Sequence, residues 1–381
     1  MTRARTIVTV AAHSVANTGG MERQLFKLIS GLLDRGHEVT VVARRCDLVP
    51  RPGLRIVRVR TPSRPSPLAY PAFFALGSIA VRRHGRGLLH TTGAIVIPRA
   101  DLSTVHFCHH AYADRFDTLR QRRKGFLYAV NAQIRARMAL LGERYCFRRS
   151  RTRHLSSVSA GARRELLKFF PTYEGAVTVI PNGVDRTLFR PSAEARVAVR
   201  SELRIPPDCL LGVFVGGEWK RKGLPHAIDA LPDAIGWHLL VVGGGDAVAA
   251  RERAAARGVR DRLHFAGAVS DPERYMAAGD AFVLPTSYET FSMATFEAAA
   301  CGLPLVNTRV SGAEEIVVDG LTGHTIEPNA DSVAHALVRL NDAEERRQMG
   351  RAALDASAAY GWDPVVDGYV ELYAQLRATA T

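Results

Sequence analysis

The sequence predicts an α/β chain built on parallel sheets, with enough length for two domains. Residues 6–12 form an apolar strand that is followed by a glycine-rich turn, a helix and a second strand, which together make a βαβ unit. Residues 281–300 pass from a short apolar run, stopped by Pro285, into an alanine-rich helix. The 381 residues exceed the usual size of a single domain.

Composition places the chain among globular proteins. Hydrophobic residues make up 47% and charged residues 23%, which is far from a disordered composition. No apolar run has the length that a bilayer span requires, and the first residues lack the plan of a signal peptide, so we expect a cytoplasmic protein. The five cysteines are scattered without paired spacing, which favours reduced thiols over disulfides or a zinc site.

Positive charge is concentrated in the first half. Residues 1–190 hold 33 Lys and Arg against 11 Asp and Glu, whereas the remainder holds 18 against 26, within a total net charge of +14. Such a half attracts anionic lipid headgroups, a phosphorylated acceptor or nucleic acid. The alternative is that arginine simply serves as a surface polar residue. No zinc-finger or RNP-like pattern supports nucleic acid.

The elements of the first half follow in order. Gln24–Leu33 has helical spacing and Glu38–Val42 is a strand. Between the first strand and this helix lie Asn17, Gly19 and Gly20, where a glycine turn lets backbone amides approach a phosphate, although a plain tight turn explains the pair equally well. Pro and Arg are frequent from residue 50 to 71, which predicts irregular structure. Further strands are expected at 88–90, 102–107 and 155–158, with a helix after the last that ends at Phe170.

A histidine-rich run follows the strand at 102–107. His106, Cys108, His109 and His110 suggest a metal site at first sight, but their spacing matches no common ligand pattern. A purely structural role for these histidines is the other interpretation.

Residues 120–153 are strongly basic with apolar residues interleaved. This pattern fits either a helix on a membrane surface or a helix that covers its domain with its arginine side chains outward.

The second half contains a phosphate-binding pattern. Leu210–Val215 is a buried strand that runs into Gly216 and Gly217, and three consecutive cations, Lys220 to Lys222, follow before a helix from residue 225. Cations that lie close together beyond the carboxyl end of a parallel strand repel one another unless an anion binds to them. A solvated turn is the competing interpretation.

Two glutamates flank the loop and helix start after the strand at 281–284. Glu289 lies in the loop and Glu297 in the early turns of the helix, so both can border one pocket and accept hydrogen bonds from paired sugar hydroxyls. A helix beginning at the carboxyl end of a parallel strand also directs free backbone amides toward an anion. The alternative is that Glu297 is a solvated helix residue and Glu289 a charge favoured by the helix dipole.

Other elements of the second half are also expected. Two strands are expected at 237–242 and 263–266, and an amphipathic helix is expected at 363–376.

These motifs resemble the retaining glycosyltransferases of family 4, the group 1 glycosyltransferases, and especially the branch of lipopolysaccharide-core glucosyltransferases. The resemblance rests on Ser-Tyr-Glu-Thr-Phe-Ser at 287–292, Phe-Glu-Ala-Ala-Ala-Cys-Gly-Leu-Pro at 296–304, Ile-Pro-Asn-Gly-Val-Asp at 180–185 and the cationic loop. It implies the GT-B fold, with two Rossmann-like doubly wound domains facing each other across a cleft. The implied domains are an acceptor-binding domain at 1–188, a nucleotide-sugar-binding domain at 189–360 and a returning helix at 361–381.

The resemblance also implies site residues. Many members place an arginine directly after the first glycine, where this chain has Gly217, so Arg221 is expected to take that role beside Lys222. The implied catalytic residues are His106, Arg221, Lys222 and Glu289; donor binding is expected from Gly19, Gly20, Gly217, Phe265, Thr290, Phe291, Ser292, Met293 and Glu297; acceptor binding is expected from His109 and Asn17.

The expected reaction moves a sugar from a nucleoside diphosphate sugar to a hydroxyl with retention. UDP-sugar is the expected donor and GDP-sugar the alternative, while the acceptor is a glycan, a lipid-linked or a small-molecule hydroxyl compound. The chain has no Asp-x-Asp, so no metal or other cofactor is expected. A nucleotide-sugar epimerase, a sugar phosphorylase and a catalytically silent nucleotide-sugar-binding protein remain as alternatives, and peripheral contact with an anionic membrane is a further expectation.

Overall fold

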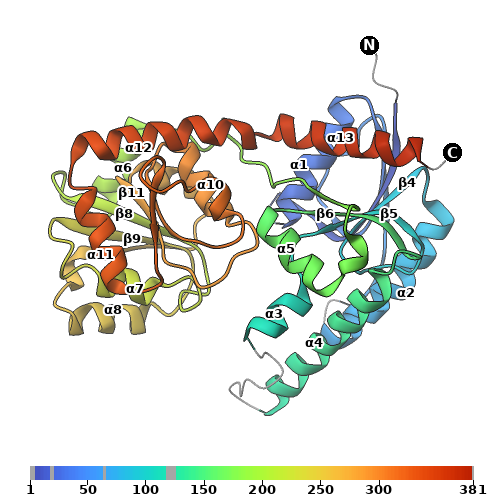
Figure 1. The fold of residues 1–381 in the computed structure, drawn as a ribbon, viewed down its shortest axis with the longest axis horizontal. Helices are drawn as coiled ribbons and strands as arrows, with labels where there is room; N and C mark the ends of the chain where they lie inside the picture. The colour runs from blue at the N-terminus through green and yellow to red at the C-terminus, as the bar shows by residue number, and fades with distance from the viewer. Residues whose placement is uncertain (1–4, 18–20, 63–65, 117–125, 380–381) are drawn as a thin grey trace. The chain divides into compact units, whose positions relative to one another are not determined.

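The computed structural model describes residues 5–17, 21–62, 66–116 and 126–379, which fold into two compact units (Figure 1). The first unit comprises residues up to Asn182 together with the segment from Trp362, and the second unit comprises Gly183–Gly361. Each unit is an α/β domain with one parallel sheet, so the predicted fold class is confirmed.

The first unit contains a seven-stranded sheet in the order β3-β2-β1-β4-β5-β6-β7. All of its strand pairs are parallel. The strands are β1 (Ile7–Val15), β2 (Glu38–Cys46), β3 (Leu54–Arg58), β4 (Leu88–Thr92), β5 (Ala100–Val105), β6 (Thr152–Ser157) and β7 (Val177–Val179). Its helices are α1 (Met21–Asp34), α2 (Ser66–His84), α3 (His109–Phe116), α4 (Phe126–Cys146), α5 (Ala160–Phe169) and α13 (Trp362–Ala378).

The second unit repeats this plan with six parallel strands in the order β10-β9-β8-β11-β12-β13. The strands are β8 (Leu210–Val215), β9 (Trp237–Val242), β10 (Leu263–Gly267), β11 (Ala281–Leu284), β12 (Leu305–Thr308) and β13 (Gly323–Ile326). The helices are α6 (Ala193–Glu202), α7 (Leu224–Asp229), α8 (Ala247–Ala256), α9 (Pro272–Ala277), α10 (Met293–Ala300), α11 (Ala330–Arg339) and α12 (Ala343–Ala356).

The strand order of each sheet reverses at one point. The sheets grow outward in one direction from β1 and β8, and in the other from β4 and β11. In doubly wound sheets, ligands bind beyond the carboxyl ends of the strands at this switch point, because the loops diverge there. The loops after β8 and β11 are those that carry the cations and the first glutamate.

The last helix packs within the first unit. Val366 of α13 lies so close to Gly31 of α1 that a Cβ atom on Gly31 would come within 2.6 Å of it. Arg35 of α1 donates a hydrogen bond to Asp367 at 3.0 Å. Val365, Tyr369 and other α13 residues join the core around β1 and β2. The final segment therefore completes the first sheet's core although it follows the second unit in sequence (Figure 1).

The prediction of irregular structure from residue 50 to 71 was wrong. Leu54–Arg58 forms the edge strand β3, and α2 begins at Ser66 and continues through Pro71. Pro71 is the sixth residue of α2 and has no backbone N–H, so the helix lacks one intrahelical hydrogen bond there. The edge position of β3 explains its weak signal, since the strand mixes two exposed arginines with partly buried apolar residues.

Candidate functional site

The loops after β8 and β11 meet at the switch point of the second sheet. Nζ of Lys222 donates a hydrogen bond to Oε1 of Glu289 at 3.0 Å, and Arg221 contacts the same oxygen at 3.3 Å. The Lys222 and Glu289 side chains are only 15% and 12% exposed. Two neighbouring cations and a glutamate 67 and 68 positions later in sequence, all predicted for one site, are thus in direct contact.

Arg221 is held by several partners. Its guanidinium donates to Oε2 of Glu218 at 2.9 Å and to the backbone carbonyl of Tyr288. Its own carbonyl accepts a hydrogen bond from the backbone N–H of Ser287 at 2.9 Å, which joins the two loops directly. Burial disfavours the charged guanidinium, but attraction to Glu289 and the hydrogen bonds to Glu218 outweigh it, so the pKa of Arg221 lies above its ordinary value. The site therefore keeps its positive charge at any physiological pH.

Two glycines allow the loop after β8 to take this shape. Gly216 has φ +141, and a Cβ atom there would come within 2.5 Å of Cδ of Lys222. Gly223 has φ +79, and a Cβ atom there would come within 1.9 Å of the Pro285 carbonyl oxygen. The first glycine gives the lysine side chain its path, and the second brings the two loops together. Gly217 is exposed beside them, and a Cβ atom there would make an ordinary van der Waals contact, 3.6 Å from the Gly244 carbonyl oxygen.

The loop after β11 leads into the N-terminus of α10. Ser292 caps this helix with φ +60, a left-handed conformation that is rare outside glycine, and its Oγ lies 2.7 Å from Oγ1 of Thr295. Gly312 approaches Phe291 so closely that a Cβ atom would come within 2.3 Å of its carbonyl oxygen. Thr290 and Met293, also predicted for donor binding, lie in the same turn. Backbone amides at such a helix start favour an anion.

Glu297 lies one turn further along α10. It is 9% exposed and therefore buried, which rejects the interpretation that it is a solvated helix residue. Its charge raises the pKa of the Cys301 thiol, second to the effect of burial on that thiol. Glu297 is therefore a buried residue of the helix that follows the loop after β11.

Phe265 takes part in an aromatic cluster at the other side of β8. Its ring lies 5.8 Å from the ring of Trp219, and the guanidinium of Arg251 lies 4.7 Å from its centroid. Nε1 of Trp219 donates a hydrogen bond to the Gly216 carbonyl at 2.9 Å. The indole also packs against Gly245, where a Cβ atom would come within 2.3 Å of it. The sequence reasoning missed Trp219; its place two residues after the glycine pair was the available signal.

In the first unit, His106 stands directly after the carboxyl end of β5. Its Nε2 donates a hydrogen bond to Oε1 of Gln24, a fully buried residue of α1. Burial lowers the pKa of His106 to about 4, so the ring is neutral near pH 7. The sequence reasoning did not anticipate Gln24, because nothing in the local sequence reveals a contact across 82 positions.

His109 and His110 are held by one buried carboxylate. The ring and backbone nitrogens of His109 donate to Oε1 of Glu143 at 2.9 and 2.8 Å, and those of His110 donate to Oε2 at 2.7 and 3.2 Å. Burial alone would raise the pKa of Glu143, but these hydrogen bonds outweigh it and hold that pKa below its usual range. Glu143 of α4 thus caps α3 and fixes both rings.

The remaining predicted residues are less constrained. Asn17 is exposed just after β1. Gly19 and Gly20 lie outside the described residues.

Across the described part of the chain, no group of three or more His, Cys, Asp or Glu side chains is arranged to hold a metal ion. Within the same residues, no helix combines the length and apolar character needed to cross a membrane.

Two protein-family models match the chain. The model described as glycosyltransferase family 4 matches residues 18–188, and the model described as glycosyl transferases group 1 matches residues 211–342. A D-inositol 3-phosphate glycosyltransferase of Xylanimonas cellulosilytica is 29% identical over 94% of this chain and 92% of the relative.

Solved structures share the whole fold. WaaG, a glycosyltransferase involved in lipopolysaccharide biosynthesis, matches with a TM-score of 0.78 and 21% identity over 96% of this chain and 99% of its own. Anabaena Alr3699/HepE, solved in complex with UDP-glucose, matches with a TM-score of 0.70 and 18% identity over 97% and 100%. Both units and their strand orders therefore follow the GT-B plan. The chain belongs to the group 1 glycosyltransferases of family 4 and is an enzyme that transfers a sugar from a nucleotide sugar.

Proposed function

We propose that this enzyme is a retaining, metal-independent glycosyltransferase that uses a UDP-sugar and glycosylates a hydroxyl of a glycan, lipid-linked or small-molecule acceptor. The second unit binds the donor and the first unit binds the acceptor. The observation that carries the proposal is the pair of cations, Arg221 and Lys222, held by Glu289 at the switch point of the second sheet. A diphosphate is the anion that suits two adjacent cations and a helix N-terminus.

The cations act on the leaving group. In the reaction, the bond between the anomeric carbon and the diphosphate oxygen breaks, and negative charge grows on that oxygen. Arg221, Lys222 and the amides of the turn at 291–293 are already fixed where this charge develops, so they stabilise the transition state without reorganising. These protein cations supply the charge that a bridging metal ion would otherwise supply.

The acceptor hydroxyl attacks on the face that the leaving group vacates, which retains the anomeric configuration. Its oxygen forms the new bond to the anomeric carbon, and its proton passes to an oxygen of the departing phosphate. Glu289 orients the donor sugar through its hydroxyls, and Glu297 accepts hydrogen bonds from the ribose. His106, neutral near pH 7, orients a sugar hydroxyl and forms no covalent bond.

Two observations support UDP as the nucleotide of the donor. The Anabaena protein of the same fold holds UDP-glucose. Phe265, with Trp219 beside it, provides an aromatic surface at the end of β10 where a base can pack. The cationic first half of the chain fits a phosphorylated or membrane-associated acceptor, and we place the enzyme at the cytoplasmic face of a membrane.

A donor screen tests this function. The protein is incubated with several UDP- and GDP-sugars, with and without EDTA, and nucleotide release is followed before and after acceptors are added. We expect slow release from one UDP-sugar, acceleration by acceptor, no effect of EDTA and a product with the donor's anomeric configuration. Epimerisation without transfer, dependence on inorganic phosphate, or complete loss of activity with EDTA would contradict the proposal.

A further inference from the structure

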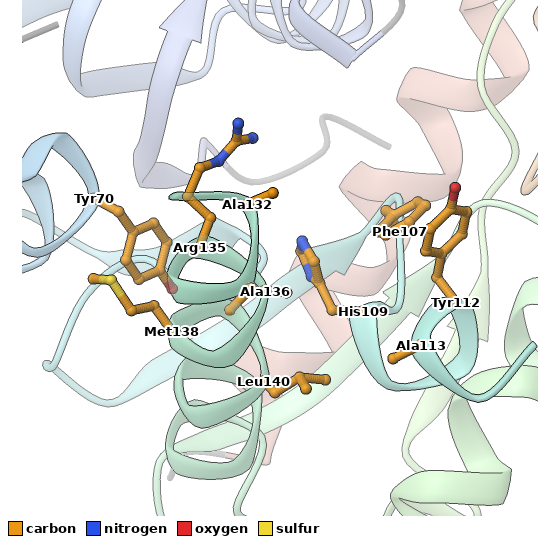
Figure 2. Close-up of a pocket in the computed structure, with 11 residues that line it drawn as sticks. Tyr70, Phe107, His109, Tyr112, Ala113, Ala132, Arg135, Ala136, Met138 and Leu140 are labelled. Carbon is orange, nitrogen blue, oxygen red and sulfur yellow. The ribbon is translucent and has the colours of Figure 1, made fainter. Parts of the chain in front are cut away.

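Two cavities lie next to each other in the first unit, between α2, α3 and α4. One has a volume of about 340 Å³ and the other about 350 Å³. Tyr70 of α2 and Met138 of α4 line both cavities, so these two side chains form their junction. Figure 2 shows Tyr70 beside Met138, with Arg135 extending away from α4.

The first cavity has polar groups and lies close to the end of β5. His109, which lines it, is three residues after His106 and is oriented by Glu143. Phe107 and Tyr112 line it from the same segment, with their rings 5.1 Å apart. The exposed guanidinium of Arg135 stands at its edge. This cavity therefore offers a histidine ring, a tyrosine hydroxyl and a positive charge beside the expected acceptor residues.

The second cavity is almost entirely apolar. Leu141 is 64% exposed although it lines this cavity, which is a large exposure for a leucine. Tyr145 lines the far end, and the guanidinium of Arg151 lies 4.8 Å from its ring. The residues that line only this cavity are Pro71, Phe74, Ile97, Leu141, Gly142 and Tyr145.

Polarity thus changes along one helix. On α4 the lining residues run from Ala132 in the polar cavity to Tyr145 in the apolar one. Thirteen helical steps separate them, which is roughly 20 Å at the rise of an α-helix. A compact sugar acceptor needs only the polar end. A ligand that suits both ends has a hydroxylated, anionic head and a long apolar tail.

We propose that the acceptor is an amphiphile of this kind, with its phosphate-bearing head at His109 and Arg135 and its hydrocarbon tail in the groove between α2 and α4. This inference rests on the proposed function, because it names the substrate class of the acceptor site. The tail is desolvated against Phe74, Ile97 and Leu141, so affinity grows with tail length until the groove is filled. Arg135 selects an anionic head over a neutral one.

Binding of n-alkyl phosphates tests the inference. Butyl, hexyl, octyl and decyl phosphate are titrated into the full chain by calorimetry, below the concentrations at which they form micelles. We expect Kd to fall about fourfold for each methylene that enters the groove. Matching alkyl glucosides should bind more weakly, and the preference for phosphate should disappear in Arg135→Leu.

Two variants of α4 distinguish binding in the groove from adsorption to the protein surface. Leu141→Arg places a charge in the apolar cavity at an exposed position, so the fold should tolerate it and the dependence on tail length should be lost. Ile134→Arg is the matched control, because Ile134 is 42% exposed on α4 and lines neither cavity. A Kd independent of tail length, or equal losses in both variants, would overturn the inference in favour of general adsorption to the apolar surface.

Failure of the inference is distinguishable from failure of the proposed function. Binding of UDP-glucose and of the other UDP- and GDP-sugars of the donor screen is measured on the same wild-type preparation. Normal UDP-glucose binding with no tail-length dependence overturns only the amphiphilic acceptor. Tail-length dependence without binding of any nucleotide sugar supports the groove as a binding site and overturns the proposed transfer reaction.

Discussion

Lys222 and Arg221 share one carboxylate oxygen, Oε1 of Glu289, at 3.0 and 3.3 Å. One negative charge thereby orders two cations that would otherwise repel each other. Glu218 supplies a second negative charge, through its hydrogen bonds to Arg221. The loop after β8 is consequently organised before any ligand binds, which is what electrostatic stabilisation of a transition state requires.

Replacing Lys222 should impair the chemical step. Lys222→Ala removes one donor to the leaving diphosphate, so we expect kcat to fall by about 100-fold or more. Lys220→Ala is the matched control, since Lys220 is exposed two positions earlier, and its kcat should stay close to that of the wild type. Steady-state kinetics on both variants check this. Equal effects in the two variants would argue that only the overall charge of the loop matters.

Adding a single methyl group at Gly216 should displace the lysine. The Cβ atom of Gly216→Ala would come within 2.5 Å of Cδ of Lys222, so the side chain must leave its present path and kcat should fall on the order of 100-fold. Gly236→Ala tests strain alone, because Gly236 has φ +83 and no atom near its Cβ position. That control should lose about 1–2 kcal/mol of stability and keep its activity at 25 °C. Comparable activity losses in both variants would show that backbone strain is responsible.

Glu297 should contribute to donor binding more than to the chemical step. Glu297→Gln keeps the size of this buried side chain but removes its charge, so the Kd for the nucleotide sugar should rise by about tenfold or more with little change in kcat. Calorimetry and kinetics measure the two quantities. An exposed residue of α8 gives the control Glu252→Gln, which should bind donor normally. A fall in kcat with unchanged Kd would assign Glu297 to the reaction centre.

The stability of the first unit should depend on pH through its buried histidines. His90 is fully buried between Tyr373 and Thr104, and burial lowers its pKa from 6.5 to about 3. Below pH 6.5 the unfolded chain therefore binds a proton that the folded chain excludes, so the free energy of unfolding falls as the pH falls. Each such histidine contributes about 1.4 kcal/mol per pH unit in this window.

Urea unfolding between about pH 7 and pH 5 measures this slope, at pH values where most carboxylates stay ionised. His106 and His13, whose pKa values burial lowers to about 4, add to it. In His90→Gln the mean slope over this range should be smaller by about 1 kcal/mol per pH unit, because the ring is only partly protonated in the unfolded chain near pH 6.5. A stability that does not change across this range in the wild type would contradict the burial of these rings as neutral groups.

Much of the fold was predictable because parallel strands are buried on both faces. β8 and β11 are short apolar runs followed directly by a glycine and a proline, and β1 begins as an apolar run with a glycine turn further on; each was predicted from that pattern. β3 and α2 were missed, because an edge strand has a mixed pattern and because frequent Pro and Arg between residues 50 and 71 indicate irregular structure. A local sequence pattern does not predict secondary structure correctly where packing against neighbouring elements determines it.

Only part of the candidate site was predictable from the sequence. Arg221, Lys222 and Glu289 were predicted for one site from a family resemblance, and their mutual contact is now visible in the second unit. The contact of His106 with Gln24 and the clamp of Glu143 on two histidines were not predictable. Such pairs are brought together by tertiary packing between helices and strands, and a single sequence carries no local trace of them.

The central claim is that Arg221 and Lys222 bind the diphosphate of the donor. The most direct test compares the Kd of UDP with that of uridine in the wild type and in the double variant Arg221→Ala/Lys222→Ala. The account predicts that the wild type binds UDP about 100-fold or more tighter than uridine, through charge-assisted hydrogen bonds, and that most of this difference disappears in the double variant. An equal preference for UDP in both proteins would contradict it.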